Sequence, residues 1–118
     1  MKEENIFTLI AGPCVLENEE TAFFIAEKLK EICHRNNINL IFKASFDKAN
    51  RTSFSSFRGL GLNNAHSIFS NIKNELKLEI LTDVHEINQI EKFYDVIDIF
   101  QIPAFLCRQT DLLIAAGK

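Results

Sequence analysis

The sequence lacks the features that mark secreted and membrane proteins. Its three cysteines, Cys14, Cys33 and Cys107, are odd in number and show no Cys-X-X-Cys spacing, so they predict no disulfide framework. No apolar run approaches the ~20 residues that a membrane-spanning helix needs. The polar start, Met1-Lys-Glu-Glu-Asn, has no apolar signal-peptide core. We therefore expect a protein of the reducing cytoplasm that has no membrane partner.

Motifs for common cofactors and for nucleic acids are also missing. The chain has no glycine-rich dinucleotide fingerprint, no P-loop and no Gly-X-Ser-X-Gly nucleophile turn. Its 13 basic and 16 acidic residues give a net charge of −3 without a long basic stripe, which argues against nucleic-acid binding. With 47% hydrophobic residues in 118 positions, the chain can bury a core as one domain or as part of a larger one.

What the sequence does have is a basic segment, residues 43–59, inside an acidic chain. Four cations and one acid give the segment a local charge of +3: Lys43, Lys48, Arg51, Arg58 and Asp47. The remaining residues carry nine bases and 15 acids, or −6. Ammonium and guanidinium groups make charge-assisted hydrogen bonds to phosphate and carboxylate oxygens, so the segment predicts an anion site. Ordinary solvated surface cations are the alternative.

The residues that lead into this segment alternate between two faces, as in a strand. Lys43 and Ser45 share one face with Ile41. The other face is apolar: Leu40, Phe42, Ala44 and Phe46. A lysine at the end of an apolar strand favours a ligand site over a solvated surface.

Hydrophobic periodicity predicts four strands that alternate with four helices. The expected strands are residues 7–12, 39–44, 79–83 and 96–102. The expected helices are one that Asn18 caps and that ends near 36–37, one over 62–76, one over 87–93 and one from Thr110. This βαβαβαβα order implies a parallel sheet with right-handed crossovers.

Polar residues gather where each expected strand becomes a loop. The four segments are residues 12–14, 43–51, 83–85 and 101–108. In a parallel α/β sheet or barrel these strand ends meet at one edge, where ligands bind, so we expect an enzyme site there. Four βα units are about half of an eight-unit barrel of ~250 residues. We therefore expect residues 1–118 to form the N-terminal half of a TIM barrel and to end inside the fourth helix.

The strand-end motifs together resemble one enzyme family. They are Ala11-Gly-Pro-Cys-Val-Leu-Glu17, Phe42-Lys-Ala-Ser-Phe-Asp-Lys-Ala-Asn-Arg51, Arg58-Gly-Leu-Gly61, Leu81-Thr-Asp-Val-His-Glu86 and Gln101-Ile-Pro-Ala-Phe-Leu-Cys-Arg-Gln-Thr-Asp111. Over residues 7–118 the chain is similar to the N-terminal half of 3-deoxy-D-manno-octulosonate 8-phosphate synthases, also called 2-dehydro-3-deoxyphosphooctonate aldolases. Related aromatic-pathway synthases, which use erythrose 4-phosphate, share the Ala-Gly-Pro-Cys start but typically have a Lys-Pro-Arg-Thr loop.

This resemblance implies a TIM-barrel transferase of defined activity. Such a synthase condenses phosphoenolpyruvate with D-arabinose 5-phosphate and releases phosphate, in the biosynthesis of the lipopolysaccharide inner core. Its site must hold two phosphates and a carboxylate, which accounts for the density of cations. The family assembles as a tetramer, so the resemblance also implies a homo-oligomer.

Residue roles follow from the same resemblance. The residues implied for phosphoenolpyruvate are Lys43, Lys48, Ser45, Gln101 and the backbone around Ala104. Those implied for the sugar phosphate are Asn50, Arg51, Ser53, with Asp83 near it, and Arg108, which would reach a neighbouring subunit's sugar phosphate. Those implied for catalysis are Lys48, Asn50 and Asp83.

Cys14 is the candidate metal ligand. On composition alone a single cysteine at a strand end is more often a small buried apolar residue. Family members with cysteine at this position use it to bind a divalent metal, together with a histidine, a glutamate and an aspartate from the second half of the barrel. One thiolate cannot build a four-coordinate site. We therefore expect a metal in the complete enzyme and none bound by residues 1–118 alone.

The remaining histidines and cysteines have ordinary explanations. His85 fits a capping or packing role as well as a site role. Cys33 is predicted to lie in the core, and His34 and His66 on the surface. Cys107 has no partner at ligand spacing.

Two further functions stay open beside a synthase whose isolated half is inactive. One is a non-catalytic half-barrel that binds a sugar phosphate or assembles through its exposed strand edges. The other is an aromatic-pathway synthase that uses erythrose 4-phosphate. A separate chain that supplies the second half of the barrel is a further expected partner.

Overall fold

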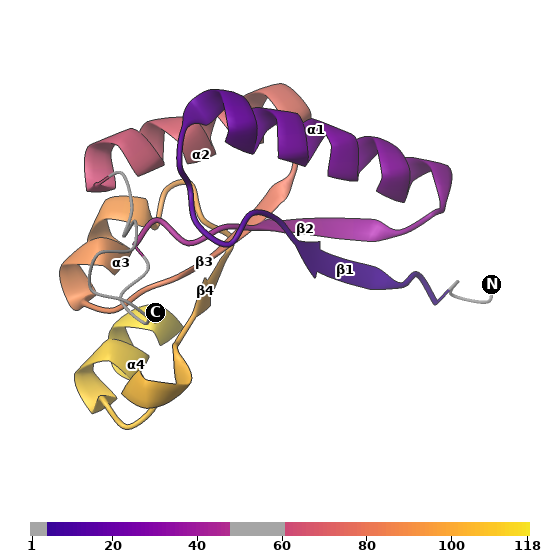
Figure 1. Cartoon of the computed structure of the whole chain (residues 1–118). Coiled ribbons are helices and arrows are strands. Elements are labelled where there is room, and N and C mark those ends of the chain that lie inside the picture. The colour runs from indigo at the N-terminus through magenta and orange to yellow at the C-terminus, as the bar shows by residue number, and fades with distance from the viewer. Residues whose placement is uncertain (1–4, 48–60) are drawn as a thin grey trace.

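The computed structural model describes residues 5–47 and 61–118, which contain a four-stranded parallel sheet (Figure 1). The strands lie in the order β1 (Thr8–Ala11), β2 (Asn39–Lys43), β3 (Glu79–Asp83) and β4 (Ile99–Gln101). The helices are α1 (Glu19–Arg35), α2 (Leu62–Leu76), α3 (Ile87–Phe93) and α4 (Thr110–Gly117), and a short 3-10 helix, η1 (Ala104–Leu106), follows β4. The predicted alternation of strands and helices is confirmed.

The parallel register brings all strand ends to one edge of the sheet. Ile10 is level with Ile41, and Lys43 is level with Leu81. Asp83, the last residue of β3, is paired with Gln101, the last residue of β4. The residues that leave the carboxyl ends of the strands are therefore neighbours in space.

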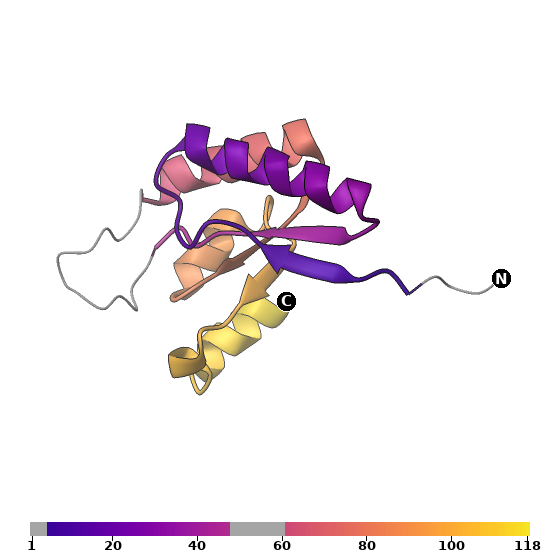
Figure 2. The same cartoon turned by 45° about the vertical axis from the view of Figure 1, so that its right-hand side comes forward.

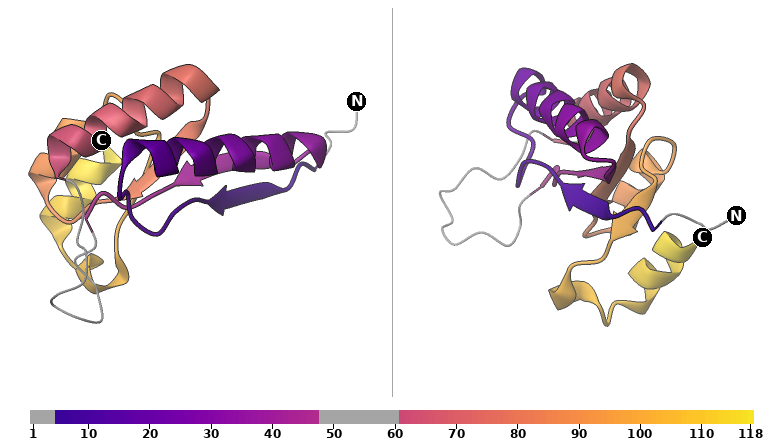
Figure 3. Two further views of the ribbon diagram at one scale, coloured as in Figure 1. Left: turned by 45° about the horizontal axis from the view of Figure 1, so that its top comes forward. Right: turned by 90° about the vertical axis from the view of Figure 1, so that its right-hand side faces the viewer.

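The helices cover one side of the sheet. Helices α1 and α2 lie side by side over β1, β2 and β3 (Figures 1 and 2). Viewed from the side, the sheet curls and the four helices follow one another around its outside (Figure 3, right). This is the arrangement of strands and helices in part of a βα barrel.

The main core lies between the sheet and these helices. Phe42 and Ile80 of the sheet and Phe69 and Ile72 of α2 are fully buried in it. The predicted face of β2 is confirmed, because Leu40, Phe42, Ala44 and Phe46 all belong to this core. Lys43 and Ser45 alternate with these residues along the chain and are not part of this core.

Helix α1 begins and ends where local chemistry predicts. The Asn18 side-chain oxygen accepts a hydrogen bond of 2.7 Å from the backbone N–H of Thr21, which satisfies one free donor of the first turn. The acidic pair that follows, Glu19 and Glu20, lies at the positive end of the helix dipole. At the other end Asn37 adopts a positive φ of 53°, so the helix ends in the predicted place.

The fourth strand is shorter than predicted. Residues 96–102 form one apolar run, but only Ile99–Gln101 are paired as β4. The backbone N–H groups of Val96 and Ile97 both bond to the Phe93 carbonyl, at 3.0 and 2.9 Å, and so continue the end of α3. Both side chains are buried in the core, which explains why an apolar run extends beyond the strand.

None of the helices in the described ranges combines the length and the apolar character that crossing a bilayer requires.

Candidate active site

A pocket of about 280 Å³ lies at the carboxyl edge of the sheet. Each of the four strands contributes residues to it from the segment in which the strand ends. The lining residues are Cys14, Lys43, Ser45, Asp47, Asp83, His85, Gln101, Pro103, Ala104 and Phe105. The described part of the chain thus brings together six of the residues predicted for the site: Cys14, Lys43, Ser45, Asp83, Gln101 and Ala104.

The ends of β1 and β2 are held together at close range, and Gly12 makes this possible. A Cβ atom on Gly12 would lie 1.8 Å from the Lys43 carbonyl oxygen, which is far inside any contact distance. Beyond this point, the Ser45 N–H donates to the Cys14 carbonyl at 3.3 Å and the Leu16 N–H donates to the Ser45 carbonyl at 2.9 Å. Backbone contacts therefore fix Cys14, Lys43 and Ser45 in one small region.

The ends of β2 and β3 are joined by a buried hydroxyl. Thr82 is fully buried, and its Oγ1 donates a 2.8 Å hydrogen bond to the Ala44 carbonyl. The Ala44 N–H in turn bonds to the Leu81 carbonyl at 3.3 Å. These bonds set the side chains on either side of Ala44 and Thr82, namely Lys43 and Asp83, at the same edge.

Asp83 and His85 form a close pair within the pocket. The His85 Nε2 atom lies 3.6 Å from Asp83 Oδ2, and both side chains are largely buried. The other polar atom of each side chain, Asp83 Oδ1 and His85 Nδ1, is buried and has no hydrogen-bond partner among the described residues. The backbone N–H of His85 is bonded to the Gln89 side-chain oxygen at 2.6 Å, as part of the cap of α3.

The described lining has one cation and two carboxylates. Lys43 supplies the positive charge, and Asp47 and Asp83 supply the negative charges. This part of the pocket alone does not favour a dianionic phosphate, so an anion site here needs further cations. Lys48, Asn50, Arg51 and Ser53, which were predicted to supply them or to bind the sugar phosphate, lie outside the described residues.

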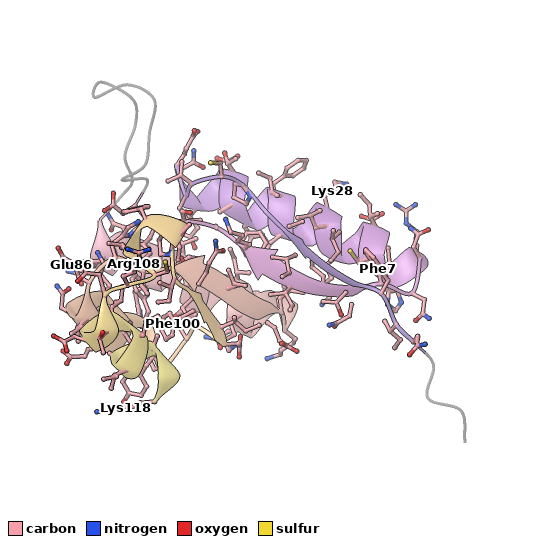
Figure 4. All side chains as sticks on the ribbon, turned by 90° about the horizontal axis from the view of Figure 1, so that it is seen from below. Phe7, Lys28, Glu86, Phe100, Arg108 and Lys118 are labelled. Atoms are coloured by element: carbon pink, nitrogen blue, oxygen red, sulfur yellow. The ribbon has the colours of Figure 1, made fainter. Side chains whose placement is uncertain are left out.

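Arg108 is separate from the pocket. It is exposed in the turn between η1 and α4 and does not line the cavity (Figure 4). Its predicted contact with a neighbouring subunit stays a prediction.

The residues around Cys14 do not form a complete metal site. Cys14 shares the pocket with Asp83 and His85. Within residues 5–47 and 61–118, however, no group of three or more His, Cys, Asp or Glu side chains is close enough to hold a metal ion. Cys14 could therefore contribute one ligand, and the others would have to come from elsewhere.

Four pocket residues were not among the predicted site residues: Asp47, His85, Pro103 and Phe105. His85 had a usable signal, because residues two apart in an extended segment point to the same side and Asp83 was already a candidate. Phe105 had none, since η1 was not predicted and its aromatic residue could as well have been a core residue.

The other histidines and cysteines follow the predictions with one exception. Cys33 is buried in the core, His34 is exposed, and Cys107 is free and exposed. His66 was expected on the surface but is half-buried, and its Nε2 lies 3.0 Å from Asp95 Oδ1. The hydrogen bond with His66 lowers the pKa of Asp95 from its ordinary value.

The parallel (βα)4 sheet, with a polar pocket at the carboxyl ends of its strands, is typical of an α/β-barrel enzyme. Residues 2–118 match the family model of the DAHP synthetase I family, and the chain belongs to this family. The family fold is a TIM barrel, so these four βα units form half of one.

Curated relatives show which enzymes of this family the chain resembles. The chain is 56% identical over 110 residues to the 2-dehydro-3-deoxyphosphooctonate aldolase of Campylobacter jejuni (strain RM1221). It is 57% identical to the protein of the same name from Desulfatibacillum aliphaticivorans and 54% identical to that of Citrifermentans bemidjiense. These matches cover 93% of this chain but only 40–41% of each relative, so the chain spans about two fifths of their length.

Proposed function

We propose that this chain supplies half of the active site of a 3-deoxy-D-manno-octulosonate 8-phosphate synthase, which condenses phosphoenolpyruvate with D-arabinose 5-phosphate. The observation that carries the proposal is the pocket in which four successive strand ends place Lys43, Ser45, Asp83 and Gln101 together. The names of the relatives support the same chemistry, since they describe aldolases of a phosphorylated deoxyoctonate.

The pocket residues suit both an anionic ligand, phosphoenolpyruvate, and a hydroxyl-bearing ligand, the sugar phosphate. Lys43 offers a cation to the carboxylate or phosphate of phosphoenolpyruvate, and Ser45 and Gln101 offer hydrogen bonds beside it. Asp83 carries a carboxylate, which repels phosphate and accepts hydrogen bonds from sugar hydroxyls. In this proposal Lys48, Asn50, Arg51 and Ser53 supply the remaining charge and hydrogen bonds, with Lys48 and Asn50 also acting in catalysis beside Asp83.

Cys14 has a place in the same proposal as one ligand of a divalent metal in the complete barrel. The described residues do not provide the other ligands, and one thiolate does not make a stable site. We therefore assign no step of the reaction to a metal held by this chain. The metal-dependent class of synthases remains the expected one because Cys14 follows the end of β1 and lines the pocket.

The isolated chain is proposed to lack condensing activity, because its described pocket has one cation where the two substrates bring two phosphates and a carboxylate. Phosphate release is measured with the 118-residue chain, phosphoenolpyruvate and arabinose 5-phosphate, alone and mixed with the C-terminal half of the Campylobacter jejuni relative. We expect no release from the chain alone and turnover in the mixture. Release by the chain alone would contradict the first expectation, and activity with erythrose 4-phosphate instead would favour the aromatic-pathway alternative.

A titration with phosphoenolpyruvate tests whether the pocket binds a ligand. Nuclear magnetic resonance titration of the chain with phosphoenolpyruvate should show shifts for residues at the strand ends. Lys43→Ala should weaken this binding by about tenfold, the loss of one charge-assisted hydrogen bond. Lys92→Ala, which removes an exposed lysine of α3, is the matched control and should change nothing. Equal affinity of the two variants would refute the proposed role of Lys43.

The edges of the sheet that are unpaired in the described part of the chain also favour assembly with another chain. Within the described ranges β1 pairs only with β2, and β4 pairs only with β3, so each has one open edge. Phe7, which precedes β1 and is labelled in Figure 4, is 68% exposed, and Ile10 is 50% exposed. Open edges with apolar neighbours are templates for pairing with another strand. We therefore propose that this chain associates with a further copy or with a separate second half.

Light scattering, together with an activity assay, distinguishes a non-catalytic assembly module from a half-synthase. A non-catalytic assembly module should form oligomers that Ile10→Lys disrupts, and it should show no turnover with any added half. A half-synthase should gain turnover when a second half is added, whatever its own oligomeric state. A monomer that Ile10→Lys leaves unchanged would remove the support for assembly.

A further inference from the structure

We propose that His85, together with Asp83, binds the hydroxyl groups of a sugar phosphate and makes this end of the pocket selective for them. This inference rests on the proposed function and adds to it a residue and a basis for selectivity. It starts from the two buried polar atoms without partners, Asp83 Oδ1 and His85 Nδ1.

The two side chains project into the same pocket from the end of β3. They are two residues apart in an extended segment, and their side chains are only 15% and 11% exposed. His85 Nε2 lies 3.6 Å from Asp83 Oδ2, which is too long for a hydrogen bond, so the two side chains are neighbours that do not satisfy each other. The other polar atoms of the pair, Asp83 Oδ1 and His85 Nδ1, are buried without a partner among the described residues, and in this proposal a ligand bonds to them.

The backbone of His85 is bonded to its own helix cap, and its ring contacts two aromatic rings. Its backbone N–H is bonded to the buried side chain of Gln89 at 2.6 Å. The ring meets Phe46 edge-on, with centroids 6.5 Å apart and an interplanar angle of 81°. Phe105, whose side chain is largely exposed, is the second neighbour, with ring centroids 6.1 Å apart. A ring fixed in this way presents its nitrogens in one orientation.

Buried polar atoms without partners are rare, because each costs ~1–3 kcal/mol relative to a bonded one. Two of them on adjacent side chains in one pocket indicate a ligand that supplies hydrogen bonds. A carboxylate oxygen accepts only, and a histidine nitrogen accepts or donates according to its tautomer. A hydroxyl group can do either, so a polyhydroxyl chain satisfies both atoms, whereas a phosphate next to Asp83 would be repelled.

This orients the ligand within the pocket. In this proposal the anionic end of the ligand lies toward Lys43, and its hydroxyl-bearing end lies toward Asp83 and His85. A sugar phosphate then binds more tightly than an alkyl phosphate without hydroxyl groups, because Asp83 and His85 bond to the hydroxyl groups. Removing the His85 nitrogens should reduce that selectivity without changing the affinity for the phosphate group.

The test compares two ligands that share a phosphate and differ in hydroxyl groups. Arabinose 5-phosphate and n-pentyl phosphate are titrated into the full 118-residue chain by calorimetry or magnetic resonance. We expect the wild type to bind arabinose 5-phosphate more tightly, and His85→Phe, which keeps an aromatic ring next to Phe46 and Phe105, to weaken the binding of that ligand about tenfold. Binding of n-pentyl phosphate should not change.

Two further variants separate hydrogen bonding to the ligand from packing. His85→Asn keeps a polar group near the position of Nδ1, the nitrogen without a partner among the described residues, so it should restore part of the selectivity even if the phenylalanine variant folds poorly. His34→Phe changes an exposed histidine of α1 and should alter neither affinity. A merely structural role of His85 would weaken both ligands together, and this result would overturn the inference.

The failure of this inference differs from the failure of the proposed function. If the wild type binds both phosphates equally well, or if His85→Phe leaves their ratio unchanged, the anion site stands and the role of His85 is wrong. If the wild type binds neither ligand, both the anion site and the inference that rests on it are refuted.

Discussion

Replacing Gly12 with alanine should damage both the stability and the ligand site of this protein. Gly12 follows β1, where the backbone passes directly against the end of β2. The added Cβ would lie 1.8 Å from the Lys43 carbonyl oxygen, 2.8 Å from its carbonyl carbon and 3.2 Å from its nitrogen. All three are backbone atoms, so no side-chain rotation can relieve the collision.

The magnitude follows from these distances. Even a close C–H···O contact needs about 3.3 Å, so the two strand ends must separate by about 1.5 Å. Overpacking of this kind typically costs about 1–3 kcal/mol. The same shift moves Lys43 and strains the hydrogen bond between Ser45 and Cys14. A displacement of about 1 Å in a binding group can reduce function by as much as 100-fold.

Urea unfolding followed by circular dichroism measures the first effect, and titration with phosphoenolpyruvate measures the second. We expect Gly12→Ala to lower the urea midpoint and to abolish binding. Gly117→Ala is the matched control, because a Cβ there meets nothing within 4 Å, and it should be neutral or slightly stabilising. A Gly12→Ala chain with the midpoint and affinity of the wild type would refute the close approach of β1 and β2.

Three other predictions test the scaffold around the site. Asn18→Ala should lower the unfolding free energy by about 1 kcal/mol, because it removes the cap of α1; a urea midpoint unchanged from the wild type would contradict this. Thr82→Val should cost about 1–3 kcal/mol, because the buried Ala44 carbonyl loses its side-chain donor; Thr82→Ser, which keeps the hydroxyl, should recover much of that loss in the same urea assay. Because hydrogen bonding with His66 lowers the pKa of Asp95, this pair stabilises the fold above the carboxyl's ordinary pKa of about 3.9, and the contribution is lost as pH falls through the lowered value. The urea midpoint should therefore fall more steeply below about pH 4 in the wild type than in His66→Ala, and parallel curves would disprove the role of the pair.

Local patterns in the sequence were enough to predict the strands and helices, and the face of β2 that lines the site. Alternation along β2 correctly separated Lys43 and Ser45 from the core residues, because a strand exposes successive side chains to opposite sides. The capping chemistry of Asn18 placed the start of α1, because a single side chain satisfies a backbone donor three residues away. Such effects act over a few residues and are visible in a linear sequence.

Contacts between distant segments could not be predicted in this way. The length of β4 depended on whether Val96 and Ile97 continued the end of α3 as a turn or paired with β3, and an apolar run fits both. The half-burial of His66 likewise depends on Asp95, which lies 29 residues away.

For the site, the sequence by itself determined which residue types leave the strand ends, because the order of βα units sends those ends to one edge. Only the tertiary structure decided that Gly12 must be glycine, since the reason is the approach of a backbone 31 residues away. It alone also showed that His85 and Asp83 share a pocket with polar atoms left unbonded. Hydrogen-bond partnership and close approach are properties of positions in space, and a linear pattern does not contain them.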